Sequence, residues 1–188
     1  MGANLITKAE YKAYADLKTP NHDVEIDALI PKVSELVKTY CNRKFVDYFG
    51  EAKVEHSNGG YGHFILAEAP VVAVDSVEYS SDYGQTYTAI AEFVDWVNDE
   101  GYIVAVSPDG FKKQLRGYRI TYKAGYETLP EDLKLAVMDL VSYYRQNDAA
   151  VHSTKAPGTN SVQIEYISTT TLPAHIRRIL DMYKADYT

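Results

Sequence analysis

The sequence is short of cysteine and of clustered basic residues, and each shortage excludes a class of protein. A single cysteine, Cys41, excludes an intramolecular disulfide and a zinc site built from cysteines, and it fits a reducing compartment. Lys and Arg occur singly or as isolated pairs such as Lys112-Lys113, whereas DNA-binding domains usually carry a dense cationic face. The net charge is −7. A dedicated nucleic-acid-binding protein is therefore disfavoured.

Long apolar runs are also missing. No uninterrupted apolar segment approaches the roughly 20 residues that span a bilayer. The first ten residues, MGANLITKAE, lack the basic region and the apolar run of a signal peptide. We therefore expect a soluble protein that is made in the cytoplasm and has no membrane partner.

Motifs for catalysis or for binding a metal or cofactor are absent from the sequence. None of the five histidines forms an HExxH pair or another compact ligand spacing, and the glycines at 59, 60 and 62 are not followed by the Lys-Ser/Thr of a phosphate loop. A pair of glycosidase acids could lie among four carboxylates whose spacing selects no two of them: Glu92, Asp95, Asp99 and Glu100. We therefore expect no enzyme, no cofactor and no metal, and a carboxylate hydrolase is only the third hypothesis.

Tyrosine, in contrast, is abundant, with 17 residues against five Phe and one Trp. Its rigid apolar ring and polar tip suit surfaces that become buried on assembly. The excess favours an oligomer, although tyrosines at the border of a β-sheet would also account for it.

The first part of the chain is predicted to be helical. Thr7 and Glu10 form a capping-box pattern, which predicts a helix over about residues 8–17. Apolar residues at helical spacing predict a second helix over about 23–42. Pro31 lies inside it and predicts a kink or a break, because proline removes one main-chain hydrogen bond.

From about residue 46 to 122 the hydrophobic period shifts towards two, which predicts a β-rich insert. The turn sequence from Ser57 to Gly60 predicts a hairpin between segments around 53–56 and 63–66. Closely spaced strands with turns between them indicate a small antiparallel sheet or an open barrel.

The chain then returns to helix. Gly125 can adopt the positive φ that ends a strand, and Pro130 opens a helix over about 130–148. Residues from about 149 to 171 are rich in Ala, Ser, Thr and Gly and predict a flexible arm. Leu172-Pro173 opens a last helix over about 173–183. The expected fold is therefore α+β: a mainly helical bundle layer with an inserted small antiparallel β-domain and a flexible C-terminal arm that ends in a short helix.

Four segments together resemble the head–tail connector proteins, or head-completion adaptors, of tailed double-stranded DNA phages. They occur in the family's order and span about residues 23–183. The segments are Tyr40 to Phe45; Phe64 to Leu66 with Ala69 to Val77; Ile120 to Tyr126 with Leu129 to Lys134; and Leu172-Pro173 with Ile176, Leu180 and Tyr183. Pro31 departs from the uninterrupted second helix that the family pattern leads us to expect.

The resemblance implies a single connector domain over residues 1–188, made in the host cytoplasm and located in the virion neck. It implies a ring, commonly of twelve copies, that binds the portal protein and the next neck or tail protein. Double-stranded DNA would cross the ring without specific binding, which the acidic composition favours. No catalytic residue is implied. The main alternative is a carbohydrate- or peptide-binding module that uses the tyrosine-rich insert.

Three groups of residues are candidates for these contacts. In the insert, exposed aromatics would carry contacts between subunits or with the tail: Tyr79, Tyr83, Tyr87 and Trp96. In the arm and the last helix, apolar positions would dock on the portal or a neighbour, or else pack on their own domain: Val162, Ile164, Tyr166, Ile176, Leu180 and Tyr183. On the second helix, acidic residues would line the pore: Asp23, Glu25, Asp27 and Glu35.

Overall fold

The computed structural model describes residues 2–99, 102–145, 151–155, 162–166 and 172–185, with the backbone alone at 151–155 and 162–166. The chain divides into two compact units. A helical unit combines Gly2–Asn42 with Leu129–Lys184, and a β unit is built around Arg43–Thr128. The predicted α+β class and the β-rich insert between helical segments are confirmed. The description of residues 1–188 as a single connector domain stays a prediction.

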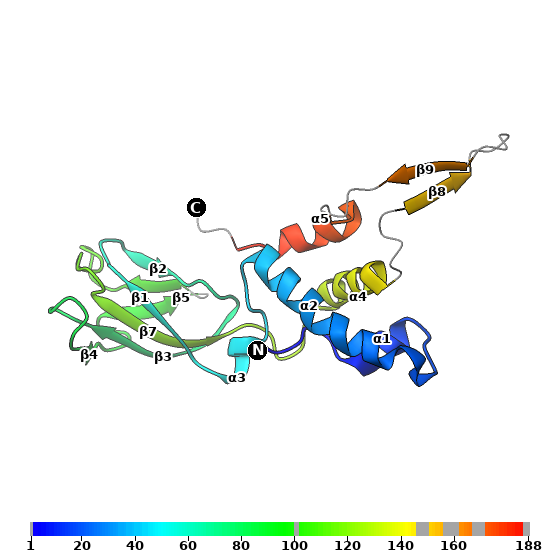
Figure 1. Cartoon of the computed structure of the whole chain (residues 1–188). Helices are drawn as coiled ribbons and strands as arrows, with labels where there is room; N and C mark the ends of the chain where they lie inside the picture. Colours follow the sequence, from blue (N-terminus) through cyan, green and yellow to red (C-terminus); the bar gives the residue numbers. More distant parts are fainter. Residues whose placement is uncertain (1, 100–101, 146–150, 156–161, 167–171, 186–188) are drawn as a thin grey trace. The chain divides into compact units, whose positions relative to one another are not determined.

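Among its described residues, the helical unit contains four α-helices: α1 (Lys8–Tyr14), α2 (Asp23–Cys41), α4 (Glu131–Arg145) and α5 (Ala174–Met182), with a short 3-10 turn η1 (Pro20–His22) before α2 (Figure 1). Helix α2 packs against α4, and α5 packs against both. Their facing sides bury apolar side chains such as Ile30, Val37, Leu133 and Leu140. Each fully buried side chain of this size contributes about 1.5–3 kcal/mol.

The helix ends follow from local chemistry. The capping box is present: the Thr7 hydroxyl accepts from the Glu10 amide at 3.2 Å, and the Glu10 carboxylate accepts from the Thr7 amide at 2.7 Å. Helix α1 ends at Tyr14 rather than near residue 17, because Asp16 adopts a φ of 50°. Helix α2 continues through Pro31, so the predicted break is wrong.

The β unit holds the short helix α3 (Asp47–Gly50) and two antiparallel sheets. One sheet has the order β1-β7-β3-β4, from Lys53–Ser57, Tyr118–Ala124, Val71–Tyr79 and Thr88–Ala89. The other has the order β2-β6-β5, from His63–Ile65, Tyr102–Ala105 and Trp96–Asp99. Figure 1 shows these strands as the cyan-to-green part of the chain.

Both sheets contribute to one apolar core. The three-stranded sheet supplies Phe64 and Ile103, and the four-stranded sheet supplies Ile120 and Tyr122, all buried in the same cluster. Along β7 buried and half-buried residues alternate. The period of two in the sequence therefore corresponds to one face of β7 turned towards this core.

The predicted hairpin around the turn at Ser57 is wrong. Strand β1 pairs with β7, and strand β2 pairs with β6. Gly59 and Gly60 adopt positive φ values of 64° and 89°, as a turn requires. The turn instead carries the chain from one sheet to the other, because a turn sequence fixes local geometry but does not choose the partner strand.

The arm contains a second β element. Strand β8 (Val151–Lys155) pairs antiparallel with β9 (Val162–Tyr166), and Val151 lies opposite Tyr166. The alternating apolar and polar residues at 162–166 therefore form strand β9, and β8 is its partner within the arm.

Candidate interaction surfaces

Three loops of the β unit are joined at one end of the four-stranded sheet. They follow β1 (residues 58–62), follow β3 (80–87) and precede β7 (111–117), and we call them the three-loop end. The Gln114 amide donates to the Asn58 carbonyl at 2.7 Å, and the Ser80 amide donates to the Gly117 carbonyl at 2.7 Å. The three loops therefore form one hydrogen-bonded surface.

Asp82 organises the loop after β3. Its carboxylate accepts from the Ser80 hydroxyl at 2.6 Å, from the Thr86 hydroxyl at 2.6 Å and from the amides of Gln85 and Thr86. These hydrogen bonds, that of Ser80 first, hold the pKa of Asp82 far below its usual value. The loop is thus closed by its own charged carboxylate and presents Tyr83, which is 66% exposed.

The four aromatic candidates of the insert lie in different environments. Tyr83 and Tyr87 belong to the three-loop end; Tyr87 is half-buried, and its hydroxyl donates to the Arg116 carbonyl at 2.9 Å. Tyr79 is half-buried at the end of β3, with its ring centroid 5.2 Å from that of Tyr118. Trp96 is only 3% exposed, and its Nε1 donates to the Ile90 carbonyl at 3.2 Å. Trp96 is therefore a core residue, and the structure leaves it no surface for a partner.

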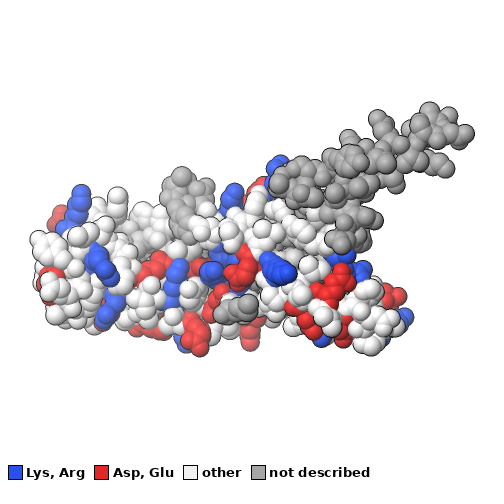
Figure 2. Space-filling view, in the orientation of Figure 1, with Lys and Arg blue, Asp and Glu red and all other residues white. Residues whose placement is uncertain are grey.

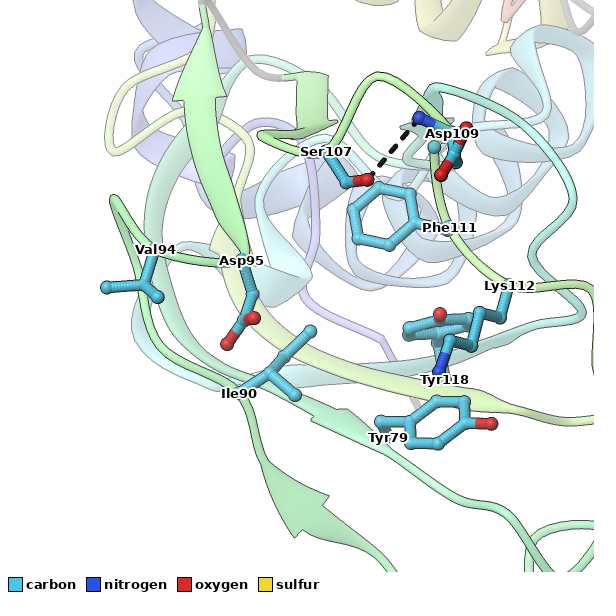
Figure 3. Close-up of a pocket in the computed structure, with 10 residues that line it drawn as sticks. Tyr79, Ile90, Val94, Asp95, Ser107, Asp109, Phe111, Lys112 and Tyr118 are labelled. Atoms are coloured by element: carbon cyan, nitrogen blue, oxygen red, sulfur yellow. Dashed lines mark hydrogen bonds between the residues drawn. The ribbon is translucent and has the colours of Figure 1, made fainter.

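A cavity of about 320 Å³ opens beside Tyr79 in the β unit. Its lining includes three aromatic side chains, Tyr79, Tyr118 and Phe111, together with Asp95, Asp109 and Lys112, and Figure 3 shows Lys112 and Asp95 on opposite sides of the group. The Asp95 carboxylate also accepts from the Ala91 amide at 2.8 Å. The cavity therefore combines an aromatic lining with charged side chains of both signs.

The acidic candidates on α2 do not form a bare negative surface. Asp23 lies 2.6 Å from the Lys12 amine, and Asp27 lies 2.8 Å from the Lys8 amine. Hydrogen bonding to Lys12 lowers the pKa of Asp23. Glu25 and Glu35 are exposed, with His22 at 3.3 Å and Lys38 at 3.6 Å respectively. Figure 2 shows both signs of charge interspersed on the visible face.

The apolar positions of the last helix lie within the helical unit. Ile176 is 1% and Leu180 is 0% exposed, and the Tyr183 hydroxyl donates to Asp132 at 2.6 Å. Ile176 and Leu180 are therefore core residues of their own unit, which is the packing alternative to a docking role. Three further candidates lie in β9, where the described backbone says nothing of side chains: Val162, Ile164 and Tyr166.

The single cysteine is buried, and the Cys41 thiol faces the Leu180 carbonyl at 3.5 Å. Within the described part of the chain, no group of three or more His, Cys, Asp or Glu residues is arranged to hold a metal ion. No helix among the described residues is both long enough and apolar enough to cross a membrane.

Two features of these surfaces were not predicted. The cavity was missed because its lining comes from β3, β7 and the loops around Ile90 and Asp109, which only the tertiary fold brings together. The capped loop had a local signal: Ser80, Asp82 and Thr86 have the spacing at which short polar side chains bind nearby main-chain amides.

Solved structures with the same fold come from virus-like particles. A chain of the neck of an empty gene transfer agent (GTA) particle, computed with C6 symmetry, matches with a TM-score of 0.61 and 18% identity, covering 98% of this chain and 91% of that chain. A chain of the native GTA virion matches with a TM-score of 0.62 and 16% identity over 98% of this chain and 91% of that chain. A chain of the native GTA neck, computed with C12 symmetry, matches with a TM-score of 0.59 and 16% identity, covering 100% of this chain and 97% of that chain.

At these identities the likeness shows a shared fold. A comparison with curated proteins gives no match. The family comparison is more informative, because one model, described as head completion protein, matches residues 4–185. That match spans both the helical unit and the β unit, and the chain therefore belongs to the head completion protein family.

Proposed function

We propose that this head completion protein forms a ring in the neck of a phage-like particle, between the portal and the tail, and that double-stranded DNA passes through the ring. The observation that carries the proposal is the extent of the fold likeness. Chains from two GTA necks match 98% and 100% of this chain, so the likeness includes both the helical unit and the β unit.

Membership of the head completion protein family also supports a structural role. Its members are structural proteins, which confirms the prediction that the chain is not an enzyme and confirms the resemblance to head-completion adaptors. Separate observations support the copy number, the partners and the passage of DNA.

Twelve copies are proposed because one of the similar neck chains comes from a map computed with C12 symmetry, and C6 symmetry is a subgroup of C12. Native mass spectrometry of the purified chain, alone and with portal rings, tests this. We expect an assembly of about twelve times 21.1 kDa, at least when portal is present. A chain that stays monomeric with and without portal would overturn the ring.

Passage of DNA fits the charge of the chain. With a net charge of −7, a ring of copies would repel phosphates rather than hold them. The four acidic residues of α2 remain the pore candidates: Asp23 and Asp27 pair with lysines of α1, whereas Glu25 and Glu35 pair with His22 and with Lys38 of α2 itself.

Docking on the portal is proposed for the β8–β9 hairpin. A two-stranded hairpin is marginally stable in water by itself, and its free edges can add to a sheet of another protein. Replacing residues 151–166 by a short Gly/Ser linker should leave the helices intact and abolish co-sedimentation with portal rings. A linker variant that still binds portal would remove the hairpin from the proposal.

The alternative function, a carbohydrate- or peptide-binding module, is favoured by one observation, the aromatic cavity beside Tyr79 and Tyr118. A glycan or peptide array probed with the monomeric chain separates the two functions. Specific binding by a chain that forms no ring would support the module.

A further inference from the structure

Charge is segregated along the β unit. No Lys or Arg occurs between Lys53 and Lys112, although acidic residues are frequent there. The next stretch reverses this pattern, since no Asp or Glu occurs between Asp109 and Glu127 and five basic residues do: Lys112, Lys113, Arg116, Arg119 and Lys123. Such segregation places a positive segment on a unit that is otherwise acidic.

The positive segment includes an exposed loop with an apolar residue in its middle. In the loop 112–116, the side chains of Lys112, Lys113 and Arg116 are exposed, and Leu115 is 59% exposed. Burial lowers the pKa of nearby His56, and the guanidinium groups of Arg116 and Arg119 lower it further. The loop therefore presents an aliphatic side chain within a positive field.

The cavity offers complementary chemistry. Its lining is mainly aromatic and aliphatic, and it also includes two carboxylates, Asp95 and Asp109, and one cation, Lys112 (Figure 3). The adjacent residues Phe93 and Val94 are 77% and 68% exposed, and Glu92 beside them is exposed as well. We call Glu92, Asp95 and Asp109 the acidic rim. At about 320 Å³, the cavity exceeds the roughly 150 Å³ that accommodates a benzene molecule, so a leucine side chain fits.

We propose that the loop segment 113–116 of one copy docks on the cavity of a neighbouring copy, with Leu115 inserted and with Lys113 and Arg116 facing the acidic rim, while Lys112 stays part of the cavity wall of its own copy. The proposal rests on the ring proposed above, because it names a contact between ring subunits. A second copy is the occupant because the same chain carries both complementary surfaces. Contacts between two different surfaces of one chain are the kind that close into rings.

Opposite charge reversals test the contact. The loop-reversed variant carries Lys113→Glu and Arg116→Glu, and the rim-reversed variant carries Glu92→Lys and Asp109→Lys. Asp95 is left unchanged because it binds the Ala91 amide. Sedimentation velocity should show that each variant alone self-associates about tenfold more weakly than the wild type. An equimolar mixture should recover association, because the acidic loop of one variant then meets the basic rim of the other.

Two further variants sharpen the result. Leu115→Ser should also weaken association about tenfold, as truncation of an interface anchor does. The control Lys18→Glu with Lys32→Glu makes an equal change of charge at exposed positions of the helical unit and should leave association unchanged. Circular dichroism of every variant should match that of the wild type.

The outcomes separate this contact from the ring itself. Rings that persist with unchanged affinity in the loop and rim variants would overturn the contact and leave the ring standing. Variants that form normal rings but fail to bind portal or tail protein would assign the loop to a different partner and also overturn it. A wild-type chain that never self-associates, with or without portal, would overturn both.

Discussion

The amide of Tyr126 donates a hydrogen bond of 2.7 Å to the carbonyl oxygen of Phe45 and so joins the two ends of the β unit. Gly125 lies between β7 and this bond, with a φ of 103°. A Cβ added to Gly125 would lie 1.9 Å from the Phe45 oxygen. The glycine is therefore required both by its backbone conformation and by the close approach of the chain that enters the unit.

The first prediction follows from this contact. Gly125→Ala should lower the free energy of unfolding by at least about 2 kcal/mol, because an L-residue at this φ is strained and its Cβ meets main-chain atoms. Thermal and urea unfolding of the purified chain measure this. Gly62→Ala is the matched control, since a Cβ there meets nothing within 4 Å. Equal stability of the two variants would contradict the prediction.

The second prediction concerns pH. The folded-state pKa of Asp82 lies below the unfolded value of about 3.9, so its stabilising hydrogen bonds are fully present above that value. They are lost as the pH falls through the folded-state pKa. The stability difference between wild type and Asp82→Asn should therefore be constant above about pH 5 and shrink below about pH 4. Asp75→Asn removes a carboxylate at an exposed position of β3 and is the control. A stability difference between wild type and Asp82→Asn that does not change with pH would contradict the lowered pKa of Asp82.

Much of the fold could be predicted because the deciding signals are local. The capping box at Thr7, the apolar spacing of α2, the proline at 130 and the glycine at 125 each fix a helix or a turn from neighbouring residues alone. Strand pairing could not be predicted in this way. The alternation in Lys53–Ser57 is satisfied equally by β2 or β7, and the choice of β7 depends on a core to which both sheets contribute.

Among the candidate interaction residues, too, local sequence is enough to place some and not others. Exposure of Tyr83 follows from a turn rich in short polar residues, so sequence reasoning places it at the surface. Trp96 lies on a four-residue edge strand whose burial depends on packing against the opposite sheet, and aromatic character by itself does not distinguish a core ring from an interface ring. The same holds for helix α5. Its amphipathic face predicts that the face is buried, but it does not determine whether the covering surface belongs to the same chain or to another.

The third prediction tests the place of α5. Ile176→Ala and Leu180→Ala should each destabilise the helical unit by about 2–5 kcal/mol, because both side chains are buried against α2 and α4. Hydrogen exchange should increase in the helices and remain unchanged in β3 and β7. Arg178→Ala, at an exposed position of the same helix, should have little effect. Normal stability after both core substitutions would restore a docking role for this face.

The fourth prediction concerns the pore. Glu25→Lys with Glu35→Gln should leave the fold intact, because the Glu25–His22 pair is exposed and glutamine still offers an oxygen to the buried Lys38 amine, and should slow DNA ejection from assembled particles. The matched variant Asp23→Lys with Asp27→Lys removes the pairs to Lys8 and Lys12 and should reduce stability as well. Ejection kinetics that are identical in wild type and the Glu variant would leave the electrostatic argument without support.

The fifth prediction concerns Tyr83 as a contact residue of the three-loop end. Its ring is 66% exposed and is held out by a loop that Asp82 closes, so little conformational entropy would be lost when a partner covers it. Tyr83→Ser should therefore weaken ring assembly or tail attachment about tenfold or more, whereas Tyr83→Phe retains the ring and should remain close to wild type. Trp96→Ser is a different case: it removes a core residue and should unfold the β unit instead of acting on assembly alone. Native mass spectrometry and reconstitution with tail protein measure both steps, and circular dichroism separates the two mechanisms. Normal assembly and tail attachment by Tyr83→Ser would show that the exposed ring is not an interface anchor.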